Sequence, residues 1–110
     1  MNNITSASEI DALFKQGRRA GTELLVVLTL PTPDRRGPEG RVVFVAGKKL
    51  GGAVLRNRCK RVVREAVRRA GGPWAGADVA LLARRGTATA PPAELDAALA
   101  TALRRLGVPR

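Results

Sequence analysis

The chain has 110 residues, and 20 Lys and Arg against 9 Asp and Glu give it a net charge of +11 at pH 7. This length predicts one domain, residues 1–110, with one modest hydrophobic core. The chain has no His and a single Cys, Cys59, which excludes a Ser-His-Asp relay, a Cys-His pair and a zinc site built from Cys or His. No secretory signal and no apolar segment of transmembrane length is found, so the sequence predicts a soluble, cytoplasmic protein.

The first segment predicts a helix of about ten residues that ends at Gly17. Ser6 and Glu9 have the S-x-x-E spacing of a capping box, in which each side chain accepts a hydrogen bond from the backbone N–H of the other residue. The apolar residues of this segment share one helical face: Ile10, Leu13 and Phe14. On periodicity alone, this face is expected to pack against the core.

The sequence predicts that three segments form strands. Residues 22–30 are rich in Leu and β-branched residues without helical period, as expected for a strand that is buried on much of both faces. Residues 41–46 and residues 77–83 form two more short apolar runs. The connection over residues 31–40 contains three Pro and two Gly residues, so we expect an exposed turn that joins the first two strands as a hairpin.

Two further helices complete the predicted order. The longer is Ala53–Ala70, which a Gly-Gly-Pro sequence closes, and the last follows Pro91 and Pro92 and runs to Gly107. The order α-β-β-α-β-α indicates an α+β domain with helices packed on one sheet. The strands on either side of the long helix would be parallel if they share that sheet, and the hairpin would make the sheet mixed.

The long helix is divided into an apolar and a polar side. At about 100° per residue, seven residues including Cys59 fill the apolar side, which predicts a small buried thiol rather than a reactive one. The opposite side is one continuous polar arc, and its members are Arg56, Asn57, Lys60, Arg61, Arg64 and Arg68. One half of the helix is therefore expected to be buried, and the other half to present cations.

The charge of this region points to a polyanionic partner. Nine basic residues and one acid lie between Lys48 and Ala70, a net +8 of the total +11. Like charges four residues apart destabilise a free helix, which argues against a merely solvated face. Phosphates along an RNA or DNA strand would neutralise these charges. A helix bound to a membrane surface is the less favoured alternative, because the apolar side is needed to cover the sheet.

At these residues the sequence resembles a known family. Residues 48–51 (Lys-Lys-Leu-Gly) and 53–65 (Ala-Val-Leu-Arg-Asn-Arg-Cys-Lys-Arg-Val-Val-Arg-Glu) are similar to the signature of the bacterial ribonuclease P protein component. The resemblance extends over residues 4–106, through the segment 14–17, the strand that begins at Leu25 and the strand from Asp78 to Arg84.

The resemblance implies a fold and a function. The fold would be a two-layer sandwich of a mixed sheet and three helices, like a ribosomal protein domain, with a left-handed strand-helix-strand crossover against the usual right-handed rule. The chain would bind two RNA partners, the ribonuclease P RNA and precursor tRNA, and promote endonucleolytic removal of the tRNA 5′ leader. Hydrolysis and its Mg²⁺ would belong to the RNA subunit, with no catalytic or metal-binding residue and no obligate partner protein in this chain.

The resemblance also implies two sets of site residues. The residues expected to face the catalytic RNA are Lys48, Lys49, Arg56, Asn57, Arg58, Lys60, Arg61 and Arg64, and the polar arc adds Arg68. The residues expected at a cleft for the leader are Ile10, Phe14, Lys15 and Leu28. Ile10 and Leu28 occupy positions that are often aromatic in the family, which predicts a more aliphatic cleft. The alternative is a non-catalytic RNA-binding or ribosome-assembly module, which the composition alone supports equally.

Overall fold

The computed structural model describes residues 1–108, except for the side chain of Arg36. It contains three helices and four strands, in the order helix, three strands, helix, strand, helix. The helices are α1 (Ala7–Gln16), α2 (Ala53–Arg69) and α3 (Pro92–Leu106), and the strands are β1 (Arg18–Gly21), β2 (Leu25–Pro31), β3 (Arg41–Val45) and β4 (Ala77–Ala83). Two 3₁₀ turns, η1 (Asp34–Arg36) and η2 (Lys48–Leu50), lie on either side of β3. The predicted order and the α+β class are confirmed, and the short strand β1 is an addition to them.

The strands form one mixed sheet in the order β1-β2-β4-β3. β3 and β4 are parallel, as predicted from the helix between them, and the other neighbours are antiparallel. The predicted hairpin between residues 22–30 and residues 41–46 is wrong, because β4 lies between the corresponding strands β2 and β3. β4 is buried over its first five residues, so it belongs at the centre of the sheet, and the less buried β3 takes the edge.

The hairpin of this fold joins β1 to β2 instead. The Thr22 hydroxyl accepts hydrogen bonds from the backbone N–H groups of Leu24 and Leu25, at 3.3 and 3.2 Å. These bonds form a turn, so β2 begins only at Leu25. β1 has one buried residue, Ala20, so its sequence carries no strand pattern. It is held by its ladder to β2 and by Arg18, which donates to the carbonyl of Leu106 at 3.0 Å.

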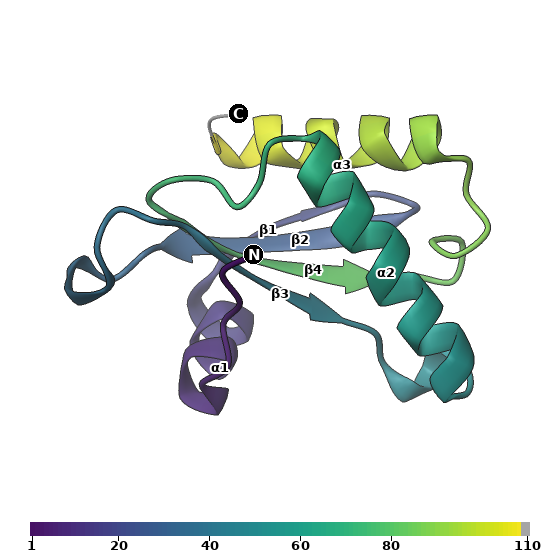
Figure 1. Ribbon diagram of the computed structural model, residues 1–110, viewed down its shortest axis with the longest axis horizontal. Helices are drawn as coiled ribbons and strands as arrows, with labels where there is room; N and C mark the ends of the chain where they lie inside the picture. Colours follow the sequence, from purple (N-terminus) through teal and green to yellow (C-terminus); the bar gives the residue numbers. More distant parts are fainter. Residues whose placement is uncertain (109–110) are drawn as a thin grey trace.

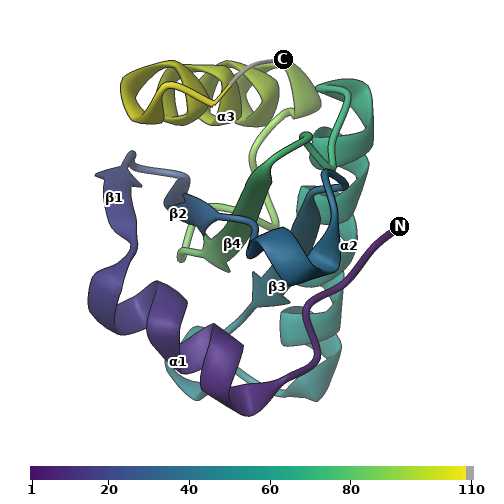
Figure 2. The ribbon, with the colours of Figure 1, turned by 90° about the vertical axis from the view of Figure 1, so that its left-hand side faces the viewer.

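Helices cover both faces of the sheet (Figures 1 and 2). The main core lies between the sheet and the pair α2 and α3, with Val27, Val79 and Leu99 fully buried. α1 packs on the opposite face, where Leu13 meets a smaller cluster. With β3 and β4 pointing away from the viewer of Figure 2, the chain turns counter-clockwise from β3 through α2 to β4. This is the left-handed crossover that the family resemblance implies.

An ion-pair network fixes α1 to the sheet. Arg41 of β3 donates to Glu9 of α1, with Nη2 2.5 Å from Oε2, and to Asp78 of β4, with Nη2 2.5 Å from Oδ2. The Thr32 hydroxyl also donates to Asp78, at 3.0 Å. The side chains of Arg41, Glu9 and Asp78 are 12%, 14% and 6% exposed. The hydrogen bond to Glu9 and, to a smaller extent, the one to Asp78 raise the pKa of Arg41, which keeps this group a cation.

The network also explains why the predicted capping box does not form. Helix α1 begins after Ser6, as expected, but the Ser6 side chain makes no cap hydrogen bond and instead lies 3.0 Å from the hydroxyl of Ser8. Glu9 points to Arg41, which is 32 residues further along the chain. A charge-assisted contact that is largely shielded from water outweighs a local contact to a neutral backbone N–H.

Replacing Arg41 with Met is expected to lower the free energy of unfolding by about 3 kcal/mol, because two shielded carboxylates would lose their cation. Urea denaturation measures this loss, with Arg104→Met as an exposed control that should stay within about 0.5 kcal/mol of wild type. Folding raises the pKa of Arg41 above its ordinary value, which is already far above neutral, so its contribution to stability is fully present at neutral and moderately alkaline pH. The loss should therefore be the same from about pH 7 to 10. An equal loss in both variants would contradict the network.

Candidate nucleic-acid interface

Helix α2 buries the side that its sequence predicts. Cys59, Val63 and Val67 are at most 2% exposed. Val63 and Val67 belong to the main core, and Cys59 packs in a smaller cluster with Ala46 and Ala88. The helical pattern places Leu55 on the buried apolar side, and this expectation is wrong, because Leu55 is 40% exposed. The first turn of α2 extends beyond the end of β3 (Figure 1), so no sheet residue lies there to cover it.

The basic side of α2 is divided into two rows. The outer row is exposed and consists of Asn57, Arg58, Arg61 and Arg68. The inner row is half-buried and consists of Arg56, Lys60 and Arg64, spaced four residues apart. Lys48 and Lys49 are exposed on η2, which contacts α2. The structure therefore gathers all nine candidate RNA-binding residues on α2 and the turn that precedes it, a surface that we call the α2 face.

No cation of the α2 face is neutralised by an acid within the described residues. The ion pairs among the described side chains are those of Arg41 with Glu9 and Asp78, and one between Arg69 and Asp96 of α3, at 2.8 Å. A hydrogen bond to Asp96 raises the pKa of Arg69, but Arg69 lies at the border of the polar side, outside the candidate set. The α2 face thus keeps its positive charge available for a phosphate polymer.

The inner row is in contact with the protein itself. The guanidinium carbon of Arg64 lies 5.2 Å from the centre of the Phe44 ring, a cation-π distance. The Nε atom of Arg56 is buried and has no hydrogen-bond partner in the described part of the chain. Phe44 was not among the candidate residues. The signal that could have revealed it is its place in β3, directly before the helix that carries the cations.

The predicted cleft residues lie at α1 but differ in exposure. Phe14 is 47% exposed, which corrects the expectation from periodicity that it is a core residue, and Lys15 is also exposed. Ile10 is half-buried and packs against the cluster that contains Leu28. Leu28 is 2% exposed, so it supports this cluster from within and offers no surface of its own.

Two residues that the sequence analysis missed lie beside α1. Val43 of β3 and Leu82 of β4 are half-buried and pack against the same cluster as Ile10. Both side chains are on the α1 face of the sheet, because they alternate with core residues along their strands. Strand alternation alone could have placed them there. Together with Phe14 they make the open surface at α1 aliphatic with one aromatic ring.

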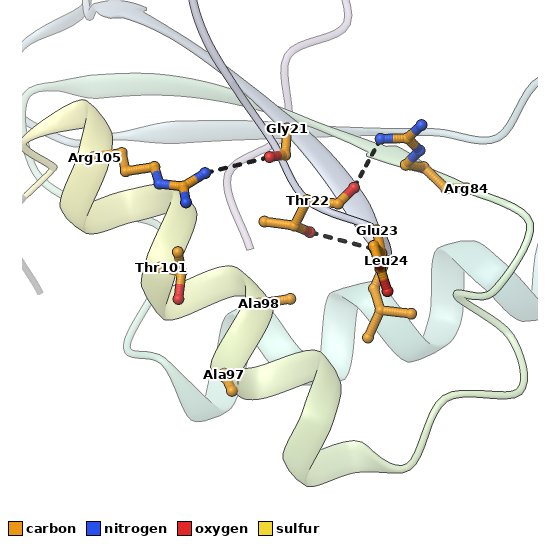
Figure 3. A pocket seen from close by; sticks show the side chains of 9 residues that line it. All are labelled: Gly21, Thr22, Glu23, Leu24, Arg84, Ala97, Ala98, Thr101 and Arg105. Carbon is orange, nitrogen blue, oxygen red and sulfur yellow. Dashed lines mark hydrogen bonds between the residues drawn. The ribbon is translucent and has the colours of Figure 1, made fainter.

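A pocket of about 620 Å³ lies between the β1–β2 turn and α3 (Figure 3). Arg84 donates to the carbonyl of Thr22 at 2.7 Å and Arg105 to that of Gly21 at 3.5 Å. These arginines connect the hairpin to β4 and α3 and therefore have a structural role. Within residues 1–108, no three Asp, Glu or Cys residues come together as metal ligands, and no helix is long and apolar enough to cross a bilayer.

The fold and the α2 face define a class of protein, a basic α+β domain that offers a polyanion one helical surface of unpaired cations. The family model of ribonuclease P matches residues 1–107. The ribonuclease P protein component of Dehalococcoides mccartyi is 36% identical over 95 residues, which cover 86% of this chain and 76% of that protein. The component from Thermobifida fusca is 36% identical over 115 aligned positions, which cover 99% and 78%.

Solved structures agree with these relatives. The RNase P protein of Staphylococcus aureus matches with a TM-score of 0.81 at 24% identity, covering 98% of this chain and 97% of that chain. The RNase P protein of Thermotoga maritima matches with a TM-score of 0.78 at 25% identity, covering 96% and 97%. The chain belongs to the ribonuclease P protein family. Members of this family are protein components of the ribonucleoprotein that processes the 5′ ends of tRNA.

Replacing Val63 with Ala is expected to lower the free energy of unfolding by about 2 kcal/mol, because it removes methyl groups from a filled core. Leu55→Ala removes one carbon atom more, but from the exposed first turn of α2, and should cost no more than about 0.5 kcal/mol. Urea denaturation of both variants tests which side of α2 is buried. A greater loss for Leu55→Ala would mean that the helix is rotated from the described orientation.

Proposed function

We propose that this chain is the protein subunit of ribonuclease P, which binds the catalytic RNA through the α2 face and contacts the 5′ leader of precursor tRNA at α1. The observation that carries the proposal is the set of cations on α2 that have no acidic partner in the described chain, on a helix whose other side is fixed in the core. An Arg-rich, rigidly held surface of this kind suits a folded RNA with many phosphates.

The chemistry of the chain supports the proposal that the RNA carries out hydrolysis. The sequence has no His, and the carboxylates of Glu9 and Asp78 are engaged by Arg41. The described residues bring together no carboxylate cluster that fits Mg²⁺, so we assign Mg²⁺ to the RNA subunit. The side chains of the α2 face would lower the repulsion between RNA phosphates, and so favour the folded RNA and its cations at lower Mg²⁺ concentration.

The surface at α1 would take the leader. Phe14 provides a ring that is 47% exposed, on which one base can stack. Lys15 offers a charge to the neighbouring phosphate, and the half-buried Ile10, Val43 and Leu82 provide apolar contact. Stacking contacts accept any base, and a single ring gives few of them. We therefore expect this subunit to bind leaders with little sequence preference.

The salt dependence of RNA affinity tests the α2 face. If four to six of its residues contact phosphates, the logarithm of the association constant for ribonuclease P RNA should fall against the logarithm of salt concentration with a slope of magnitude about 3 to 5. Filter binding or fluorescence anisotropy over a series of KCl concentrations measures this slope. A nearly flat plot would mean that phosphate contacts do not drive binding.

A reconstituted cleavage assay tests the proposed function. Adding the protein to ribonuclease P RNA and precursor tRNA at low Mg²⁺ should stimulate removal of the leader. The double variant Arg56→Ala, Lys60→Ala should bind the RNA about tenfold or more weakly, because two phosphate contacts are lost, and should need correspondingly more protein. The control variant Arg35→Ala, Arg104→Ala removes the same number of positive charges from exposed positions away from α2, and should stimulate like wild type.

Two outcomes would contradict the proposal. If the protein binds RNA tightly but does not stimulate cleavage, the chain is a non-catalytic RNA-binding or assembly module. If both double variants lose activity equally, net charge rather than the α2 face determines binding.

A further inference from the structure

Two arginines on α2 carry the same charge in different settings. Arg61 is exposed and contacts no acid or ring in the described structure, whereas Arg64 is half-buried and lies over Phe44 at 5.2 Å. The two residues are three positions apart on one helix. They form a natural matched pair for asking what the contact with the ring contributes.

Phe44 is held firmly beneath Arg64. It lies in β3, where its backbone is in register with Leu81 of the central strand. Its side chain packs against the main core, and it is only half-buried. One part of the ring is thus fixed by the core while another part is open to the guanidinium. The ring is a rigid support because the core beneath it is closely packed.

Contact with an aromatic ring leaves the hydrogen-bonding capacity of an arginine intact. The five N–H donors of a guanidinium lie in its plane, while the interaction with a ring uses its charge and its flat face. No carboxylate within the described residues forms an ion pair with Arg64. Arg64 is therefore restrained in position, yet its donors are free for a phosphate. A restrained side chain loses less conformational entropy on binding than a freely moving one.

We propose that Phe44 is a positioning residue for RNA binding: its ring restrains Arg64 so that this guanidinium binds an RNA phosphate more strongly than the exposed Arg61 does. Phe44 itself makes no contact with the RNA in this proposal and acts through Arg64. The inference rests on the proposed function, because it concerns the same α2 face and the same RNA.

The test measures the affinity of the full-length protein for ribonuclease P RNA at one fixed KCl concentration. We expect Arg64→Gln to weaken binding about tenfold and Arg61→Gln about threefold, because a restrained, charge-assisted contact is stronger than a mobile one. Phe44→Leu keeps an apolar side chain but removes the ring, and should weaken binding about threefold. Phe44→Tyr keeps the ring and should bind within about twofold of wild type.

A double-variant cycle separates positioning from a structural effect. In the Arg64→Gln background, Phe44→Leu should cause no further loss, because no guanidinium remains to be positioned. Urea denaturation shows that each variant is folded under the binding conditions. If Phe44→Leu weakens binding by the same factor in both backgrounds, or Phe44→Tyr binds as poorly as Phe44→Leu, the role of Phe44 is structural and the inference is wrong.

The two glutamine variants separate this inference from the proposed function. If Arg61→Gln and Arg64→Gln weaken binding equally while Phe44→Leu binds like wild type, the α2 face binds RNA but Phe44 does not position Arg64. If neither glutamine variant changes affinity, the proposed use of the α2 face is wrong as well.

Discussion

The structure depends on the two sides of helix α2, one of which is buried in the core while the other carries the positive charges. Val63, Ala66 and Val67 are at most 2% exposed and fix the helix against the sheet and α3. The same burial orients the opposite side, so cations that would repel one another on a free helix are kept together. Core packing therefore maintains an electrostatically unfavourable surface, and a bound polyanion would relieve that repulsion.

The chain uses its arginines in two distinct ways. Arg41 is enclosed by Glu9 and Asp78 and joins α1 to the sheet, and Arg84 donates to a backbone carbonyl of the β1–β2 hairpin. The cations of the α2 face have no such partners among residues 1–108. Because both groups have the same chemistry, composition and net charge cannot distinguish them. The distinction comes from the fold, which places acids and carbonyls beside one group and not beside the other.

Sequence patterns predicted elements whose periodicity is set by a continuous core. α2 and β4 lie where their apolar residues indicated, and Cys59 is buried as expected. The position of β4 between β2 and β3 was not predictable, because strand order is a property of the whole sheet. The contact of Glu9 with Arg41 and that of Arg64 with Phe44 were missed for a related reason. Both join residues that are distant in sequence, and a local motif such as a capping box gives no information about them.

RNA binding by the α2 face is tested most directly by chemical modification of arginines in the presence and absence of ribonuclease P RNA. Phenylglyoxal treatment followed by mass spectrometry reports each arginine separately. Arg56, Arg61 and Arg64 should be protected when the RNA is bound, while Arg35 and Arg104 should react to the same extent with and without it. Unchanged reactivity of the α2 arginines in the complex would show that the RNA binds elsewhere and that the α2 face is not its binding surface.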